Sequence, residues 1–203
     1  MLRVLALCGV IVLGSAPAAQ AEWHLTPMAG LTMFGNTSLF DREDATGKRH
    51  GHLGGSVALL GGGIFGAEAL TIWTPGFFDQ DDFDLVDSSR TISAMANVVI
   101  TTPRRWTEYG LRPFVSGGFG LMHATVTADV LPINVNTVGV NIGGGAIGFL
   151  TAHTGLRFDV RYHSTLNRLN DDEVPSIGPV HLRYVTASIG LVFRRGGAAT
   201  TVR

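Results

Sequence analysis

Large apolar and charged residues alternate near the C-terminal end of the chain, and this alternation is the most informative pattern in the sequence. The segment reads Leu156, Arg157, Phe158, Asp159, Val160, Arg161, Tyr162. In a β-strand, a period of two places the apolar side chains on one face and the charges on the other. In a soluble sandwich the charged face would meet water. In a small membrane barrel the apolar face would contact lipid, and the charges would line a closed lumen.

Similar patterns elsewhere predict an all-β chain of eight strands. Gly pairs interrupt most apolar stretches, and no helix-length amphipathic pattern occurs, which favours twisted strands over helices. Each predicted strand has at least nine residues, a length that suits a tilted membrane-spanning strand. The predicted strands are 23–34, 52–60, 64–73, 91–102, 113–127, 139–149, 155–166 and 182–194.

The connections between these strands alternate in length. Long connections cover 36–51, 74–90, 128–138 and 167–181, and shorter ones cover 61–63, 103–112 and 150–154. Twelve of the sixteen acidic residues fall in the long connections, outside the part that would cross hydrocarbon. Long loops at one end and short turns at the other are the plan of an outer-membrane barrel. We therefore predict an eight-stranded antiparallel up-and-down transmembrane β-barrel with both termini on the periplasmic side.

Most of the strands have two faces of opposite polarity. In the last strand Ile189 and Phe193 share the apolar face, while Ser188 lies on the other. The third strand fits less well, because Glu68 shares its face with Leu70 and Ile72. Aromatic residues occur where strands end, as membrane interfaces favour: Trp23, Trp73, Phe77, Phe78, Trp106, Tyr109 and Phe193.

The first residues have the features of a secretory signal peptide. Arg3 precedes an apolar run that ends at Leu13, and the segment closes on Ala19-Gln20-Ala21, an A-x-A cleavage pattern. The apolar run is too short to span a bilayer as a helix. The only cysteine, Cys8, lies in this segment, so a mature chain would lack thiol chemistry. The predicted organisation is a signal peptide at 1–21, a barrel at 22–194 and a short tail at 195–203.

Four charged residues are predicted to pair inside the lumen. They are Glu68, Arg157, Asp159 and Arg161, with Asn97, Asn141 and His123 as neutral neighbours. Side chains fill the interior of an eight-stranded barrel, and buried charges there must pair to offset desolvation. A structural plug of salt bridges is the favoured interpretation. A gated ion path through the plug is the alternative.

His163 suggests a second kind of chemistry. A lipid A deacylase of the outer membrane also uses a small barrel, with a His and a Ser two residues apart on a late strand. Here Thr165 holds the second position, Ser164 falls on the opposite face, and the Ser-Asn pair of that family is missing. We therefore predict no catalytic residues and no enzymatic activity.

Acidic residues in the second long connection are candidate cation ligands. Five aspartates lie between Asp79 and Asp87, and carboxylate oxygens suit Ca²⁺ or Mg²⁺. Their spacing matches no EF-hand loop. We interpret the segment as a solvated loop, so no metal and no other cofactor is predicted. The formal net charge of −1 and the lack of a basic patch interleaved with aromatics argue against nucleic acid as a partner.

Four segments carry a resemblance to a known family: 62–68 (GGIFGAE), 74–78 (TPGFF), 112–120 (RPFVSGGFG) and 155–162 (GLRFDVRY). In this order and spacing they resemble the small bacterial outer-membrane β-barrel family of OmpA/OmpX type, often labelled "porin family". The likeness runs from about Trp23 to Arg194. It implies an eight-stranded barrel, no cofactor and frequently no assigned activity. Such proteins usually end on an aromatic residue that the assembly machinery reads, whereas ten residues follow Phe193 here.

These observations predict a structural or surface-interaction protein of the Gram-negative cell outer membrane, exported through the periplasm, with its lumen plugged by paired charges. The expected partners are outer-membrane lipid, lipopolysaccharide and the barrel-assembly machinery, and the expected state is a monomer. One alternative is a narrow pore for small solutes or ions. Another is a soluble lipocalin-like ligand binder, which would need the apolar stripes inside and the charges of 157, 159 and 161 exposed.

Overall fold

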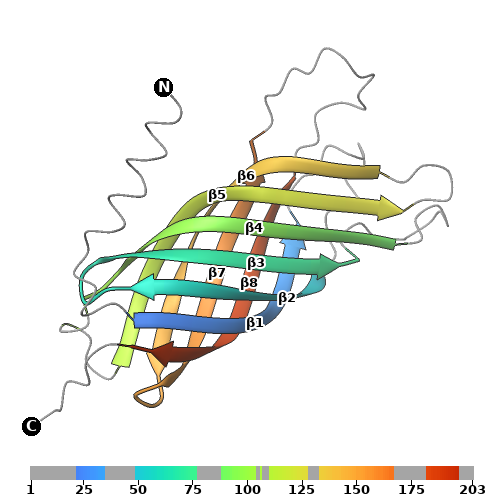
Figure 1. The fold of residues 1–203 in the computed structure, drawn as a ribbon. Coiled ribbons are helices and arrows are strands. Elements are labelled where there is room, and N and C mark those ends of the chain that lie inside the picture. The colour runs from blue at the N-terminus through green and yellow to red at the C-terminus, as the bar shows by residue number, and fades with distance from the viewer. Residues whose placement is uncertain are drawn as a thin grey trace, which may run out of the picture.

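A computed structural model describes residues 22–34, 49–76, 88–103, 106, 110–127, 133–166 and 182–196. These residues form a closed antiparallel barrel in which each strand pairs with the next and the last pairs with the first (Figure 1). The strands are β1 (Glu22–Phe34), β2 (Arg49–Leu60), β3 (Phe65–Pro75), β4 (Ser88–Thr101), β5 (Leu111–Thr127), β6 (Ile133–Phe149), β7 (Thr154–Thr165) and β8 (Arg183–Arg195). The described residues contain no helix with the length and hydropathy of a membrane span. The predicted eight-stranded up-and-down barrel is confirmed.

The largest difference from the predicted strands is at the start of β6. The strand begins at Ile133 and not at 139, because its first residues continue the antiparallel ladder with β5, from Asn134 opposite Thr125 to Thr137 opposite Met122. Polar Asn134 and Asn136 had the composition of a loop. Backbone pairing with a neighbouring strand overrides that local preference. As a result, β5 and β6 extend well along the end of the barrel that carries the long connections (Figure 1).

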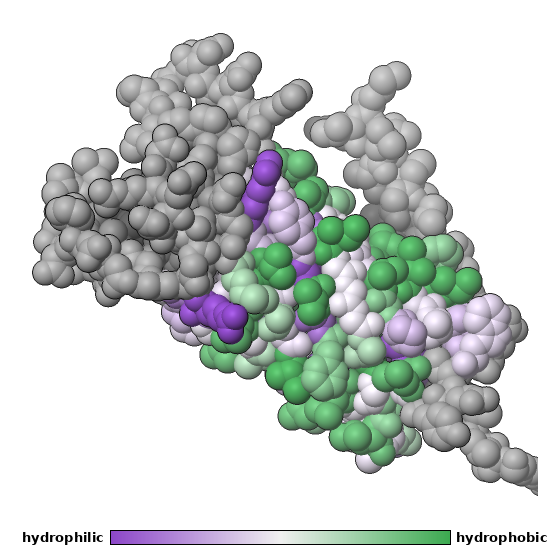
Figure 2. Space-filling model, turned by 180° about the vertical axis from the view of Figure 1, so that it is seen from behind, coloured by the Kyte–Doolittle hydropathy of each residue, from purple (hydrophilic) through white to green (hydrophobic). Residues whose placement is uncertain are grey.

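Polarity is inverted relative to a soluble protein. The side chains of Phe158 and Ile189 are 55% and 49% exposed on the exterior, whereas Arg157 and Asp159 are 4% and 5% exposed and point inward. Figure 2 shows the largely hydrophobic exterior on one face of the barrel. A soluble lipocalin-like binder requires the opposite arrangement. The exposed apolar side chains therefore form the surface that contacts lipid.

The interior is packed in layers. One apolar cluster lies towards the long-connection end and contains Met28, Leu70, Ile72, Met95, Met122, Ala124, Leu182 and Tyr184. A second lies towards the short-turn end and contains Ala58, Leu60, Val99, Phe114, Ile147 and Val192. On β4 the inward sequence Met95, Asn97, Val99 passes from one cluster to the other through a polar residue. The poor fit of the third strand has its explanation here, because Leu70 and Ile72 belong to the interior.

Both described ends of the chain lie at the short-turn end, where Trp23 pairs with Arg195. The ladder between β1 and β8 is interrupted only at Thr26 and Pro27 within its paired range. Proline has no backbone N–H to donate, which accounts for the interruption. At the same end, Gly110 has a φ of 71° just before β5, a left-handed conformation that glycine adopts without steric cost.

Candidate functional site: the charged layer of the lumen

The four predicted charged residues lie together in the middle of the barrel. Arg157, Asp159 and Arg161 occupy alternate positions on β7, so the period of the strand turns all three inward. Glu68 reaches them from β3, on the other side of the lumen. All four side chains are buried. We call them the charged layer.

Each arginine of the charged layer contacts both carboxylates. Arg157 donates to Glu68 and, through Nη2, to Asp159 Oδ2 at 2.6 Å. Arg161 Nη2 lies 3.1 Å from Glu68 Oε2 and 2.9 Å from Asp159 Oδ2. Arg161 Nε also donates to Asp159 Oδ1 at 3.2 Å. The two positive and two negative groups balance, so the layer is neutral as a unit.

Neutral side chains add hydrogen bonds around the charged layer. Asn97 Nδ2 donates to Glu68 Oε2 at 3.2 Å, and Asn141 Nδ2 donates to Asn97 Oδ1 at 2.7 Å. Arg161 Nη1 donates to Asn141 Oδ1 at 2.9 Å. Both asparagines were expected here. His123 was also expected, but it lies on the outer face of β5, where its Nδ1 is 2.7 Å from Asn136 Oδ1.

Glycines on neighbouring strands make the room that the charged layer needs. Gly143 and Gly145 of β6 lie opposite Arg161 and Asp159 of β7. On the other side of β7, Gly190 of β8 lies opposite Arg157. A Cβ at Gly143 would sit 2.9 Å from the Cα and Cβ of Arg161. The glycine run at 143–145 therefore serves close packing beneath large side chains.

A second polar group closes the short-turn end of the lumen. His24 Nε2 and Arg194 Nη1 lie 3.5 and 3.6 Å from Glu22 Oε2. Phe149 packs against both of these residues, with its ring edge-to-face with the His24 ring and the Arg194 guanidinium carbon 5.0 Å from its centroid. The sequence reasoning missed this group, although the period of β1 already placed residues 22 and 24 on the inner face.

His163 lies inside the barrel with no exposed surface. Its ring stacks on Tyr184, with centroids 4.7 Å apart and an interplanar angle of 11°. Thr165 shares the inward face, and its hydroxyl accepts a hydrogen bond from the Leu182 amide at 3.0 Å. Towards the same end, His52 Nε2 lies 2.9 Å from Ser188 Oγ. The His163–Tyr184 and Thr165–Leu182 contacts join β7 to the neighbouring chain at the start of β8, and the His52–Ser188 contact joins β2 to β8 over the inner face of β1.

No group of three His, Cys, Asp or Glu side chains in the described ranges is arranged to hold a metal ion. The acidic connections with Asp79–Asp87 and Asp171–Glu173 lie outside the described residues, as do the predicted signal peptide at 1–21 and most of the tail.

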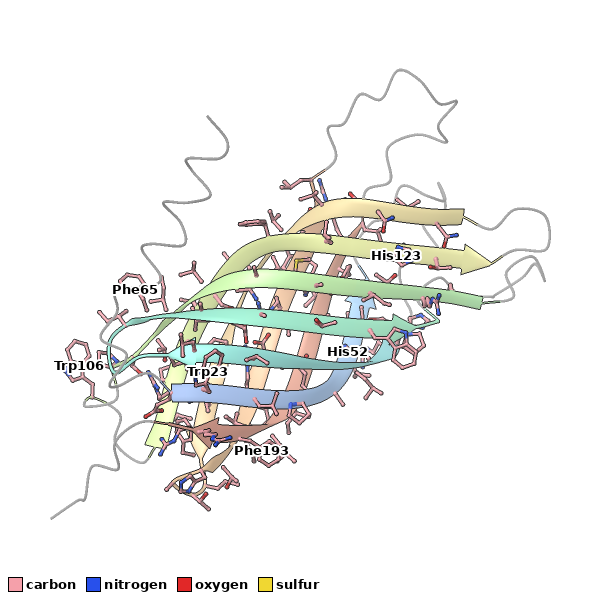
Figure 3. The ribbon with its side chains drawn as sticks, viewed as in Figure 1. Trp23, His52, Phe65, Trp106, His123 and Phe193 are labelled. Carbon is pink, nitrogen blue, oxygen red and sulfur yellow. The ribbon has the colours of Figure 1, made fainter. Side chains whose placement is uncertain are left out.

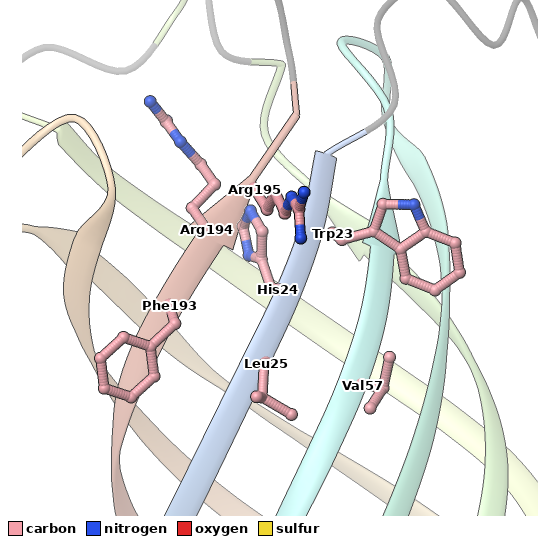
Figure 4. Close-up of a pocket in the computed structure, with 7 residues that line it drawn as sticks. All are labelled: Trp23, His24, Leu25, Val57, Phe193, Arg194 and Arg195. Carbon is pink, nitrogen blue, oxygen red and sulfur yellow. The ribbon is translucent and has the colours of Figure 1, made fainter.

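An apolar hollow of about 320 Å³ lies on the outside of the barrel, where β1 meets β2 and β8 near the short-turn end (Figure 4). It is lined by Trp23, His24, Leu25, Val57, Phe193, Arg194 and Arg195. Trp23 and Phe193 are exposed apolar side chains at strand ends, the position that aromatic residues take at a membrane interface.

A closed eight-stranded barrel with an apolar exterior and a polar, filled lumen defines an integral membrane β-barrel protein. The family described as "Outer membrane protein beta-barrel domain" has a model that matches residues 5–194, and the chain belongs to this family. The family implies a location in the outer membrane. The expected resemblance is thereby confirmed.

Solved structures with the same fold come from several bacteria. Neisserial surface protein A has a TM-score of 0.61 and 13% identity, covering 85% of this chain and 97% of that one. OprG of Pseudomonas aeruginosa has a TM-score of 0.51 and 13% identity, with coverages of 89% and 98%. Ail of Yersinia pestis, solved with the heparin analogue sucrose octasulfate, has a TM-score of 0.51 and 13% identity, with coverages of 87% and 99%. A sequence search of curated proteins found no match.

Proposed function

We propose that this protein is a sealed outer-membrane barrel that acts as a structural and surface-interaction protein, without a conducting pore and without catalysis. The main support for this proposal is the charged layer, in which each of the two arginines contacts both carboxylates. The long connections would then face outward and carry the interactions.

The physical case for a seal rests on cost. An ion that passes the charged layer must separate paired groups that are already desolvated. Losing one partner of a buried ion pair costs about 3–5 kcal/mol, because the other charge is left buried and unpaired. Apolar clusters lie on both sides of the charged layer and fill part of the lumen, beside buried hydroxyl and imidazole side chains. Removing one charged side chain would remove both the obstruction and the neutrality.

Planar-bilayer recording on the refolded mature protein tests this proposal. Wild-type protein is expected to stay at baseline. Arg161→Ala leaves the layer with one excess negative charge, so its openings should be cation-selective. Glu68→Ala leaves one excess positive charge, so its openings should be anion-selective. A reversal of selectivity between these two variants would trace the path through the charged layer.

The matched control is Arg183→Ala, because Arg183 is an arginine that points outward on β8. This variant should stay at baseline. The gel shift between heated and unheated samples checks that each variant is folded, and Glu68→Gln offers an isosteric alternative. Steady conductance in the wild type, unchanged by Arg161→Ala, would reject the sealed barrel and favour the narrow pore.

The absence of catalysis is proposed from the position of His163. Its imidazole is enclosed in the lumen against Tyr184, so the acyl chains of membrane lipid outside the barrel do not reach it. Ser164 occupies the other face of β7 and directs its hydroxyl towards the Thr165 carbonyl at 3.5 Å. A nucleophile and its base must lie within hydrogen-bond reach of each other.

A further inference from the structure

The exterior changes from apolar to polar over three adjacent strands, β4, β5 and β6. Rows of residues paired across these strands show the change, moving towards the long-connection end: Ala94–Leu121–Val138, then Ile92–His123–Asn136, then Arg90–Thr125–Asn134. Leu121 is 65% exposed to the exterior. The first row therefore lies at the depth of the hydrocarbon, and the third row lies at the level of the lipid headgroups.

The polar members of these rows form one surface, which we call the outer polar patch: Arg90, His123, Thr125, Asn134 and Asn136. Arg90 and both asparagines are exposed. His123 Nδ1 lies 2.7 Å from Asn136 Oδ1, and Thr125 Oγ1 lies 3.0 Å from His123 Nε2. The first contact joins β5 to β6 and the second lies within β5, and together they hold the His123 ring in place. Figure 3 shows where His123 lies along the barrel.

Charge on the barrel exterior has one sign among the described residues. The outward-facing charged side chains there are Arg49, Arg90, Arg183 and Arg195. The described acidic residues Glu22, Glu68 and Asp159 all point into the lumen. The exterior wall of the described barrel thus attracts anions. Arg90 is an outward arginine with the His123 imidazole on the neighbouring strand β5 and the Asn134 and Asn136 amides on the next strand, β6.

We propose that the outer polar patch binds the phosphorylated sugar headgroup of an outer-leaflet glycolipid. Arg90 would bind a phosphate, because a planar guanidinium pairs well with phosphate oxygens. Asn134 and Asn136 would bind sugar hydroxyls through their amides. The acyl chains would lie on the apolar row below, over Leu121 and Val138. This inference rests on the proposed outward orientation of the long connections.

The test measures binding of a purified glycolipid that carries phosphate monoesters to the refolded mature protein in detergent micelles, by native mass spectrometry. Arg90→Gln should weaken binding about tenfold, equivalent to 1.4 kcal/mol. Asn136→Ala should weaken it severalfold. Glycolipid treated with phosphatase should bind the wild type about tenfold more weakly, and Arg90→Gln should not weaken it further.

Arg183→Gln is the matched control, since it removes an outward arginine from β8, and it should leave binding unchanged. Equal loss in Arg183→Gln and Arg90→Gln would show diffuse electrostatic attraction and overturn the site. Equal binding of phosphatidylglycerol would show that no sugar is recognised and would also overturn it. Tighter binding of a soluble sulfated oligosaccharide through the same residues would reject the lipid. The bilayer recordings above judge the sealed lumen independently, because the patch lies outside the barrel.

Discussion

At the scale of single residues, the barrel interior is a match between very large and very small side chains. The arginines of β7 are accommodated because glycines face them from β6 and β8, as Gly143 faces Arg161. A Cβ at Gly143 or Gly145 would lie within about 3 Å of backbone atoms of β7. Packed interiors have little spare space, so such close contacts would destabilise the folded barrel.

Gly143→Ala should therefore destabilise the barrel by about 1–3 kcal/mol. The added Cβ would lie 2.6 Å from the Val160 carbonyl oxygen, and backbone cannot move aside cheaply. Gly51→Ala is the control, because a Cβ there meets nothing within 4 Å. Urea unfolding of the refolded proteins, followed by tryptophan fluorescence, measures both. Equal midpoints for the two variants would contradict this account of the glycine run.

The residues of the charged layer could be found from the sequence for a simple reason. Charged residues at every second position of an apolar strand share one face. When the other face contacts lipid, that charged face must line the interior, and this holds for Arg157, Asp159 and Arg161. His123 was misplaced because a neutral polar residue fits either face. His123 follows Met122, whose side chain points inward, so the His123 side chain points outward.

At the scale of elements, β7 is the clearest strand because its two faces meet different media. Its outward side chains, among them Phe158 and Val160, contact lipid, and its inward side chains include the three β7 members of the charged layer. The extension of β6 to Ile133 had no such signal. Its first residues are polar and lie beyond the apolar band, where a strand and a loop have similar composition.

The depth of β7 in the membrane can be measured with a charge scan. Val160→Lys places a cation near the middle of the strand and should cost about 2–4 kcal/mol, whereas Leu166→Lys, just past its end, should cost about 0–1 kcal/mol. Both side chains are exposed on the barrel exterior, so the difference reports depth and not packing. Unfolding in phospholipid vesicles gives the two values. Similar costs at the two positions would place β7 outside the hydrocarbon.

At the scale of the whole molecule, the fold follows from an inversion that begins in the sequence. Apolar residues cover the exterior, and the charged layer fills the centre between two apolar clusters, with buried polar side chains beside them. The alternation of long and short connections was enough to predict closure and topology. The polar group at Glu22, His24 and Arg194 was not predicted, because it joins the first and last strands and appears only when the ring closes.

Because the barrel is closed, we expect that the chain can begin at a different strand and still form the same strand pairs. Trp23 pairs with Arg195, so residues 22 and 196 are close enough for a short glycine-serine linker to join them. A circular permutant that starts at Thr154 and ends at Leu150 would keep every ladder and leave its new ends where the old ones were. It should refold to a heat-sensitive compact band on a gel, at a wild-type yield. A permutant that stays unfolded would mean that assembly depends on which strand comes first.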